Sequence, residues 1–243
     1  MGFAQELGLL VLVGLVAGVT AVLATWYTWN NQIVNNPLPD VLFDILPDLS
    51  DITIPIPNYI YLAQFIVAIL SFQNEKKLQL VVQYIFLQSV LTTIRAITVS
   101  VTILPNIHLY EYCKKEPGDF FEVFTNIIEH GTCGDYMWSG HTASSFILYM
   151  FVHRHKSNYF FELLVGILFG GMILFLILQR WHYTVDIIIA VIVTWLTFQF
   201  YKQFENDTSP WYFSSFKWSN LCSKCRRTRE LEAEQPGYYT PMI

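Results

Sequence analysis

The chain has 243 residues, of which 53% are hydrophobic and only 14% are charged, and its formal net charge is −5. Soluble domains usually carry about a quarter charged residues, so the composition argues against an ordinary water-soluble domain and indicates a protein embedded in lipid. The charged residues are also bunched, which leaves long apolar windows between them.

The first predicted element is the uncharged run of Leu, Val, Ala and Gly from Leu7 to Trp26. Its length matches the roughly 20 apolar residues that a transmembrane helix needs. A cleaved signal peptide is the alternative, but the run has no basic flank before it and is longer than the apolar part of such peptides.

Further apolar segments follow in chain order, and each is predicted to be a span: residues 52–74, 78–105, about 139–152, 160–178 and 186–201. The sequence therefore predicts an all-α, polytopic integral membrane protein with six transmembrane helices. We expect one membrane domain over residues 1–204 and a cytosolic basic tail without fixed structure over residues 205–243.

Lysine and arginine are distributed unevenly across the predicted membrane. Six spans place both termini and two loops on one side together with ten of these residues, whereas the other side keeps three. Because basic residues concentrate in cytosolic loops, both termini are predicted to be cytosolic. The acidic connection from Asp40 to Asp51 then faces the lumen or exterior, and the glycosylation sequon at Asn206 is predicted to remain unmodified in the cytosol.

Two pairs of cysteines lie on opposite sides of the membrane in this topology. Cys113 and Cys133 share one lumenal loop, an oxidising setting in which they either form a disulfide or remain free thiols. Cys222 and Cys225 lie in the basic tail, where free thiols are again an alternative. Palmitoylation fits this juxtamembrane pair better than zinc binding, because no further Cys or His ligands accompany it.

Two polar motifs begin the fourth and sixth predicted spans: CGDYMWSGHT at residues 133–142 and HYTVD at residues 182–186. Ser139 is predicted to N-cap a helix that begins at Gly140 or His141, and the unpaired N–H groups of such a helix start suit a phosphate. Glycine at position 140 lets the backbone approach that phosphate closely. His141 would stand beside the same phosphate as a proton donor.

His182 and Asp186 are four residues apart, so at helical spacing they lie on one face, one turn apart. A carboxylate that binds one ring nitrogen fixes the tautomer and leaves the other nitrogen free to attack or to accept a proton. Two interfacial polar residues that only satisfy each other are the alternative. Ionisable residues in membrane segments are costly and usually functional, so both motifs together predict a phosphoryl-transfer site on the lumenal face.

The pairing of SGHT with HYTxD resembles the type-2 phosphatidic acid phosphatase (PAP2) superfamily, and the flanking residues resemble the sphingomyelin synthase family within it. CGDYMWSGHT is similar to that family's third motif, RWHYTVDIIIA to its fourth, and RAITVSVTILP, from Arg95, to its second. PLPDVLFD, from Pro37, resembles a first-loop element. The likeness runs in order from about Pro37 to Tyr201.

This resemblance implies a PAP2-like helical bundle and an enzyme that transfers phosphocholine or phosphoethanolamine from a glycerophospholipid to the primary hydroxyl of ceramide, releasing diacylglycerol. His182 would attack the phosphorus with Asp186 orienting it, which gives a phosphohistidine intermediate. His141 would protonate diacylglycerol and then deprotonate ceramide. No metal and no cofactor are implied, and the choice between choline, ethanolamine and inositol headgroups is left open.

Substrate-binding residues are predicted around these motifs, together with Ser139 and Gly140. Arg95 either binds the phosphate or extends toward the interface. Asp135 pairs with the headgroup amine or with His141, or is solvated. Tyr136 and Tyr183 either cage a choline ammonium with the neighbouring tryptophans or belong to an interfacial aromatic belt.

The superfamily's lipid phosphate phosphatases carry two cationic elements that this sequence lacks. The Lys-x6-Arg-Pro element is not found, and Leu176 stands where those enzymes have an arginine six residues before the last histidine. Hydrolysis of a phosphomonoester is therefore less expected than transfer from a phosphodiester, whose phosphate carries less charge.

Two other classes of function stay open at this stage. The first is a neighbouring enzyme, either a phosphatidylcholine–diacylglycerol headgroup transferase or a lipid phosphatase, and the second is a non-catalytic lipid transporter or scaffold. The expected partners are a phospholipid donor, ceramide and the bilayer, without nucleic acid, while formation of a homo-oligomer is left open. The resemblance and the lumenal site imply the Golgi or the plasma membrane.

Overall fold

A computed structural model describes residues 3–31, 37–52, 54–72, 74–105, 107, 119–129, 137–155 and 158–206, and all regular structure in these residues is helical. The helices in chain order are α1 (Phe3–Asn30), α2 (Val41–Ile45), α3 (Ile56–Ser71), α4 (Asn74–Val101), α5 (Phe120–Glu129), α6 (Gly140–Arg154), α7 (Tyr159–Leu178) and α8 (Thr184–Asn206). Asp135, Tyr136, the four cysteines and the predicted tail beyond residue 206 lie outside the described residues.

Helices occupy all six segments that were predicted to be spans, so the all-α prediction is confirmed for the described residues. Four of these helices are long and apolar enough to cross a membrane: α1, α4, α7 and α8. The other two are shorter, since α3 has 16 residues and α6 has 15. At 1.5 Å per residue α6 is roughly 22 Å long, less than the roughly 30 Å of a hydrocarbon layer. Crossing of the membrane by α3 and α6 therefore stays a prediction.

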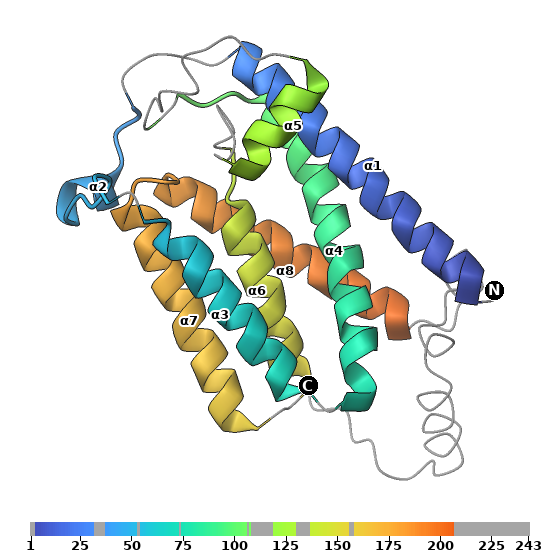
Figure 1. The fold of residues 1–243 in the computed structure, drawn as a ribbon. Coiled ribbons are helices and arrows are strands. Elements are labelled where there is room, and N and C mark those ends of the chain that lie inside the picture. Colours follow the sequence, from blue (N-terminus) through green and yellow to red (C-terminus); the bar gives the residue numbers. More distant parts are fainter. Residues whose placement is uncertain are drawn as a thin grey trace, which may run out of the picture.

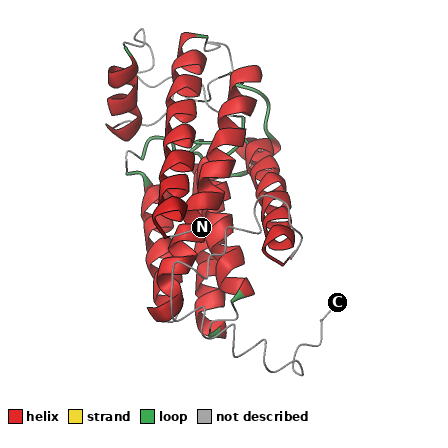
Figure 2. Cartoon of the chain, turned by 90° about the vertical axis from the view of Figure 1, so that its right-hand side faces the viewer, coloured by secondary structure: helices red, strands yellow, loops and turns green. Residues whose placement is uncertain are grey.

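The helix α6 lies inside the bundle, in contact with α3, α4, α7 and α8 (Figure 1). Most of its side chains are buried, including the small polar residues of its first two turns. The long helices α1 and α4 run side by side along one flank, and α3 packs against α7 on the other. In the view turned by 90° most helices run along one axis (Figure 2), whereas Figure 1 shows α8 crossing the others obliquely.

A buried glutamine joins the three helices α3, α6 and α7. Gln64 is fully buried, and its side-chain nitrogen donates to the backbone oxygens of Val165 (3.2 Å) and Ser145 (3.3 Å). Its side-chain oxygen accepts a hydrogen bond from the Ser145 hydroxyl. Because a buried amide without partners would be costly, these bonds fix the position of α3 relative to α6.

Large apolar side chains cover the outside of the long helices. The exposed ones include Leu15 on α1, Ile167 on α7 and Phe200 on α8, each of them at least 60% exposed. Water would disfavour such a surface, whereas a bilayer accepts it. The outward-facing apolar surface therefore agrees with integration into a membrane.

The turn between α7 and α8 presents His182. It is a Schellman motif, in which Trp181 N–H donates to the Leu176 carbonyl (2.9 Å) and Arg180 takes the left-handed conformation, with φ of 56°. Glycine is the usual residue at this position, because a side chain there costs roughly 1–2 kcal/mol. A compensating interaction of the arginine side chain is therefore expected.

The Arg180 side chain makes that compensating interaction. It is buried, its guanidinium donates to the carbonyls of Phe43 (2.7 Å) and Leu46 (3.0 Å), and it lies 4.3 Å from the centre of the Phe43 ring. Asp48 stands 3.6 Å from its Nε atom. These contacts hold the segment around α2 against the turn that carries His182.

Candidate active site

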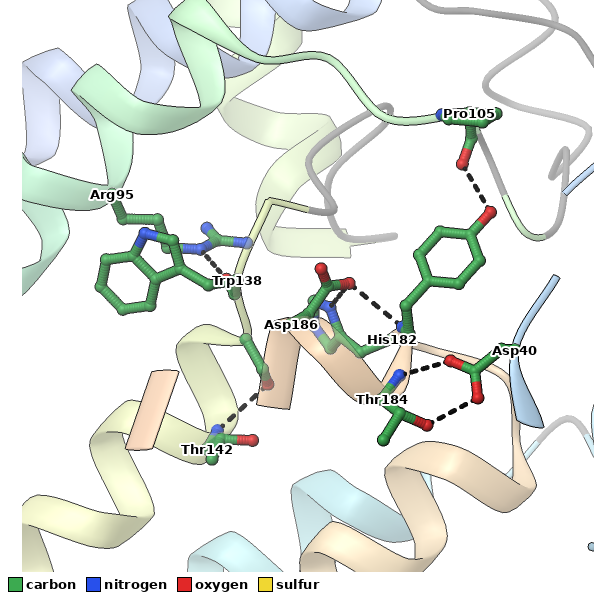
Figure 3. A network of polar contacts seen from close by, with 10 residues as sticks. Asp40, Arg95, Pro105, Trp138, Thr142, His182, Thr184 and Asp186 are labelled. Atoms are coloured by element: carbon green, nitrogen blue, oxygen red, sulfur yellow. Dashed lines mark hydrogen bonds and ion pairs between the residues drawn. The ribbon is translucent and has the colours of Figure 1, made fainter. Parts of the chain in front are cut away.

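The two polar motifs meet at one end of the bundle, where α6 and α8 begin. Ser139 N–H donates to the backbone carbonyl of Asp186 (3.3 Å), so the two helix starts are joined directly. Ser139 is the N-cap of α6, and its hydroxyl accepts a hydrogen bond from Thr142 N–H (3.2 Å), as the sequence predicts. Figure 3 shows His182 and Asp186 between Arg95 and Trp138 on one side and Asp40 and Thr184 on the other.

His182 and Asp186 form the predicted pair, but only Asp186 is helical. The Nδ1 atom of His182 lies 3.6 Å from Oδ2 of Asp186, close enough for an ion pair and longer than a hydrogen bond. The same Oδ2 atom accepts a hydrogen bond from Tyr183 N–H (3.1 Å), which is the reciprocal bond of a capping box at the start of α8. Asp186 thus fixes the helix start and also faces the Nδ1 side of His182.

His141 lies in the first turn of α6, and its ring is held between aromatic and polar neighbours. Its Nε2 atom lies 2.7 Å from Oδ1 of Asn58 in the first turn of α3. The rings of Trp181 and Tyr61 meet it edge to face, with centroids 5.7 and 6.5 Å away. The start of α6, which carries His141, is bonded to the start of α8, which follows His182, so the two imidazoles lie at the same end of the bundle.

Arg95 reaches from α4 to the start of α6. Its Nε atom donates to the Trp138 carbonyl (2.8 Å), and a Cβ atom at Gly140 would lie 3.7 Å from the guanidinium carbon. The charge of Arg95 acts on both His141 and Asp186. A guanidinium beside a helix N-terminus creates a strongly positive region, and such a region favours a bound anion.

The segment before α2 holds the start of α8 from outside. Asp40 accepts hydrogen bonds from the Thr184 backbone N–H (2.6 Å) and hydroxyl (2.7 Å), and it also caps α2 through Leu42 N–H (3.0 Å). Tyr183 adds a second link, because its hydroxyl donates to the Pro105 carbonyl (3.1 Å). Tyr183 and Thr184, which lie between His182 and Asp186, are therefore anchored to elements far away in the chain.

Asp40 is expected to make part of the stability depend on pH. Burial alone would raise the pKa of Asp40, but hydrogen bonds from Thr184 and Leu42 outweigh burial and hold its pKa below the usual value of 3.8. A carboxyl group whose pKa is lower in the folded state contributes stability above the unfolded pKa, and this contribution is lost as the pH falls.

We expect Asp40→Asn to lower the midpoint of thermal unfolding in detergent at neutral pH. We also expect the midpoint of this variant to fall less than that of the parent protein between about pH 5 and pH 3, since the carboxylate that is protonated there is gone. Asp44→Asn, at an exposed position of α2, is the matched control. An unchanged acid dependence in Asp40→Asn would contradict this assignment.

The structure brings most of the predicted site residues together but gives two of them packing roles. Tyr183 is buried, its ring stacks on Phe43 with centroids 5.7 Å apart, and its hydroxyl is bonded on both sides, since it also accepts from Leu38 N–H (3.0 Å). This placement favours positioning of α8 over contact with substrate. Ser139 is likewise buried and used as a cap.

Two residues of the site had no assigned role in the sequence. Asp40 stood within the first-loop element PLPDVLFD, which was the available signal for it. Asn58 carried no signal, because an asparagine after a proline at a helix start is common in any protein. Only the packing of α3 against α6 shows that it contacts His141.

The chain is similar to known lipid enzymes over part of its length. Residues 132–203, which contain both motifs, match the family model described as PAP2 superfamily C-terminal. In alignments of 127 residues that cover 46% of this chain, it is 29% identical to phosphatidylcholine:ceramide cholinephosphotransferase 2 of Rattus norvegicus and 28% identical to that of Homo sapiens. Human phosphatidylcholine:ceramide cholinephosphotransferase 1 is 28% identical over 128 residues.

These matches confirm the predicted resemblance to sphingomyelin synthases and to the PAP2 superfamily. The chain spans about a third of the length of these curated relatives, since the aligned part covers 35% of the rat protein and 31% of the second human protein.

Proposed function

We propose that this chain, with its PAP2-like C-terminal half, is a membrane-embedded transferase that moves a phospho-headgroup from a glycerophospholipid to the primary hydroxyl of ceramide. Two findings support this: the arrangement of His141, His182 and Asp186, and the names of the relatives, which are phosphatidylcholine:ceramide cholinephosphotransferases. Phosphocholine is therefore the first headgroup to test, with phosphoethanolamine as the second.

The first half-reaction forms a bond between His182 and phosphorus. Because Nδ1 of His182 faces Asp186, its Nε2 atom attacks the phosphorus of the donor lipid. The bond between phosphorus and the diacylglycerol oxygen breaks, and that oxygen takes a proton from the protonated His141 ring. Diacylglycerol leaves and a phosphohistidine headgroup ester remains. Asp186 stabilises the positive charge that the His182 ring acquires.

The second half-reaction returns the enzyme to its starting state. The primary hydroxyl of ceramide attacks the same phosphorus, its proton passes to the now neutral His141, and the bond between phosphorus and Nε2 breaks. His182 is again neutral and His141 again protonated, so protons and electrons balance over the cycle. Using one residue first as acid and then as base is expected for such a two-step displacement.

Arg95 and the start of α6 are proposed to hold the non-bridging phosphate oxygens. The phosphodiester carries one negative charge, and Arg95 with the N–H groups at Gly140 and His141 offers a matching positive region. The second positive charge of a phosphatase clamp is then unnecessary. This agrees with leucine at position 176.

The single observation that carries the proposal is the direct link between the two helix starts. The bond from Ser139 N–H to the Asp186 carbonyl supports one shared site for the histidine of SGHT and the His–Asp pair of HYTVD, although they are about forty residues apart in sequence. A proton donor and an oriented nucleophile at one positive site are what a phosphoryl transfer needs.

A donor and acceptor panel on the purified protein tests the function. Choline, ethanolamine and inositol glycerophospholipids are each offered with labelled ceramide in mixed micelles, and the lipid products are separated. We expect one labelled ceramide phospho-headgroup product and an equal amount of diacylglycerol. Release of a water-soluble headgroup or phosphate without any ceramide product would instead indicate a hydrolase, and no turnover with any lipid would indicate a transporter or scaffold.

The topology proposed with this function has six spans, both termini in the cytosol and the site on the lumenal face of the Golgi or plasma membrane. Sequons engineered next to Asp44 and into the tail after residue 206 test it. Glycan is expected only at the first site. A glycan in the tail would show that the true orientation is the reverse of the proposed one.

A further inference from the structure

Asn58 contacts the acid–base histidine but has no part in the mechanism described above. It lies in the first turn of α3, where its backbone N–H donates to the Pro55 carbonyl (3.0 Å). Its side-chain Oδ1 atom lies 2.7 Å from Nε2 of His141. Among the contacts that the described residues make with His141, this is the one hydrogen bond to a ring nitrogen that the structure records.

Asn58 is held in place by helix packing, because it belongs to a packed helix and not to a loop. The helix α3 packs on both α6 and α7, and Gln64, six residues after Asn58, bonds to Ser145 of α6 and Val165 of α7. The amide of Asn58 is thus carried by a helix that is tied to the same helix as His141. An acceptor on such a support can hold an imidazole in one orientation.

The chemistry of the bond distinguishes the two ring nitrogens of His141. An amide oxygen only accepts hydrogen bonds, so Nε2 of His141 must carry a hydrogen. In the neutral ring Nδ1 is then unprotonated and is the nitrogen that can accept a proton. In the protonated ring Nδ1–H is the hydrogen that remains free for donation.

We propose that Asn58 is a positioning residue that fixes His141 with Nε2–H toward α3 and assigns proton transfer to Nδ1. This inference rests on the proposed function and deepens it. The proton lost to diacylglycerol and the proton taken from ceramide then pass through the same atom, Nδ1. The ring need not flip between the two half-reactions, because the Nε2 hydrogen stays on Asn58 throughout.

The remaining neighbours of His141 do not duplicate this role. Arg95 of α4 acts on it as a charge, His182 precedes the helix whose start is bonded to the start of α6, and the rings of Tyr61 and Trp181 meet His141 edge to face. A carboxylate at position 58 would add a negative charge in direct contact with the ring and stabilise its protonated form.

The pH profile of transfer tests this role. Because the first half-reaction needs protonated His141, loss of its proton is expected to set the alkaline limb of the profile. We expect Asn58→Asp to move that limb upward by about one pH unit. We expect Asn58→Ala to move it downward and to lower kcat by on the order of tenfold, because the ring loses its fixed orientation.

The controls separate positioning from folding and from the proposed function. Tyr59→Phe, at the neighbouring exposed position of α3, is expected to keep the parent profile. Asn58→Gln keeps the amide group but displaces its oxygen. This variant replaces Asn58→Ala in the test if Asn58→Ala fails to fold in detergent. An alkaline limb unmoved in both Asn58→Asp and Asn58→Ala, or moved the same way in both, would overturn the inference. A parent protein without any transfer to ceramide would instead overturn the proposed function.

Discussion

His182→Ala is expected to reduce headgroup transfer from phospholipid to ceramide by about 10³-fold or more, since it removes the atom that bonds to phosphorus. The side chain is buried, with Nδ1 3.6 Å from Asp186, so alanine leaves no group that takes over the attack. The measurement is the initial rate of labelled ceramide product at saturating donor. Binding of the donor is expected to persist, because Arg95 and the start of α6 remain.

His153→Ala is the matched control for that loss. It removes a histidine of the same chain at the other end of α6, where Nδ1 lies 2.7 Å from Glu162 and the side chain is 64% exposed. We expect transfer at nearly the parent rate. If His182→Ala kept full activity while remaining folded, His182 would not be the nucleophile.

His141→Gln is expected to slow both half-reactions by roughly 10²-fold to 10⁴-fold, the range that general acid–base catalysis usually contributes. Glutamine can still bond to Asn58 but cannot exchange a proton, so the variant separates proton transfer from packing. Diacylglycerol is a poor leaving group without a proton, so the rate of the first step should fall when a natural donor lipid is used. The rate of diacylglycerol release in the absence of ceramide reports on that step.

A donor with a nitrophenyl leaving group tests whether His141 protonates the leaving group. Nitrophenolate leaves without protonation, so His141→Gln should release it at nearly the parent rate in the first half-reaction. His182→Ala should remain inactive with the same donor. Equal losses of His141→Gln with both donors would mean that His141 does not act as a proton donor to the leaving group.

The helical architecture could be predicted from the sequence because the apolar windows are long and the charges are few. The start of α6 at Gly140 with its Ser139 cap was also predicted, since the signal is local. The spacing of His182 and Asp186 predicted their proximity but suggested one helix face. The structure instead places His182 before α8, because the hydrogen bond from Tyr183 N–H to the Asp186 side chain marks a helix start two residues later.

The supporting residues could not be predicted in the same way. Asp40 and Thr184 are 144 residues apart in the chain, and Asn58 and His141 are 83 apart. No local pattern links such residues, since their contact depends on how α3 and the α2 segment pack against α6 and α8.

The short central helix has a consequence for the fate of the phosphoenzyme. The start of α6 lies well below the ends of α1 and α4 at the same end of the bundle (Figure 1). If the ends of α1 and α4 mark the level of the headgroups, a phosphorus atom bound at the start of α6 would lie beneath that level, where water is scarcer than at the surface. On that premise we expect the phosphohistidine of the proposed mechanism to react with the hydroxyl of a lipid faster than with water.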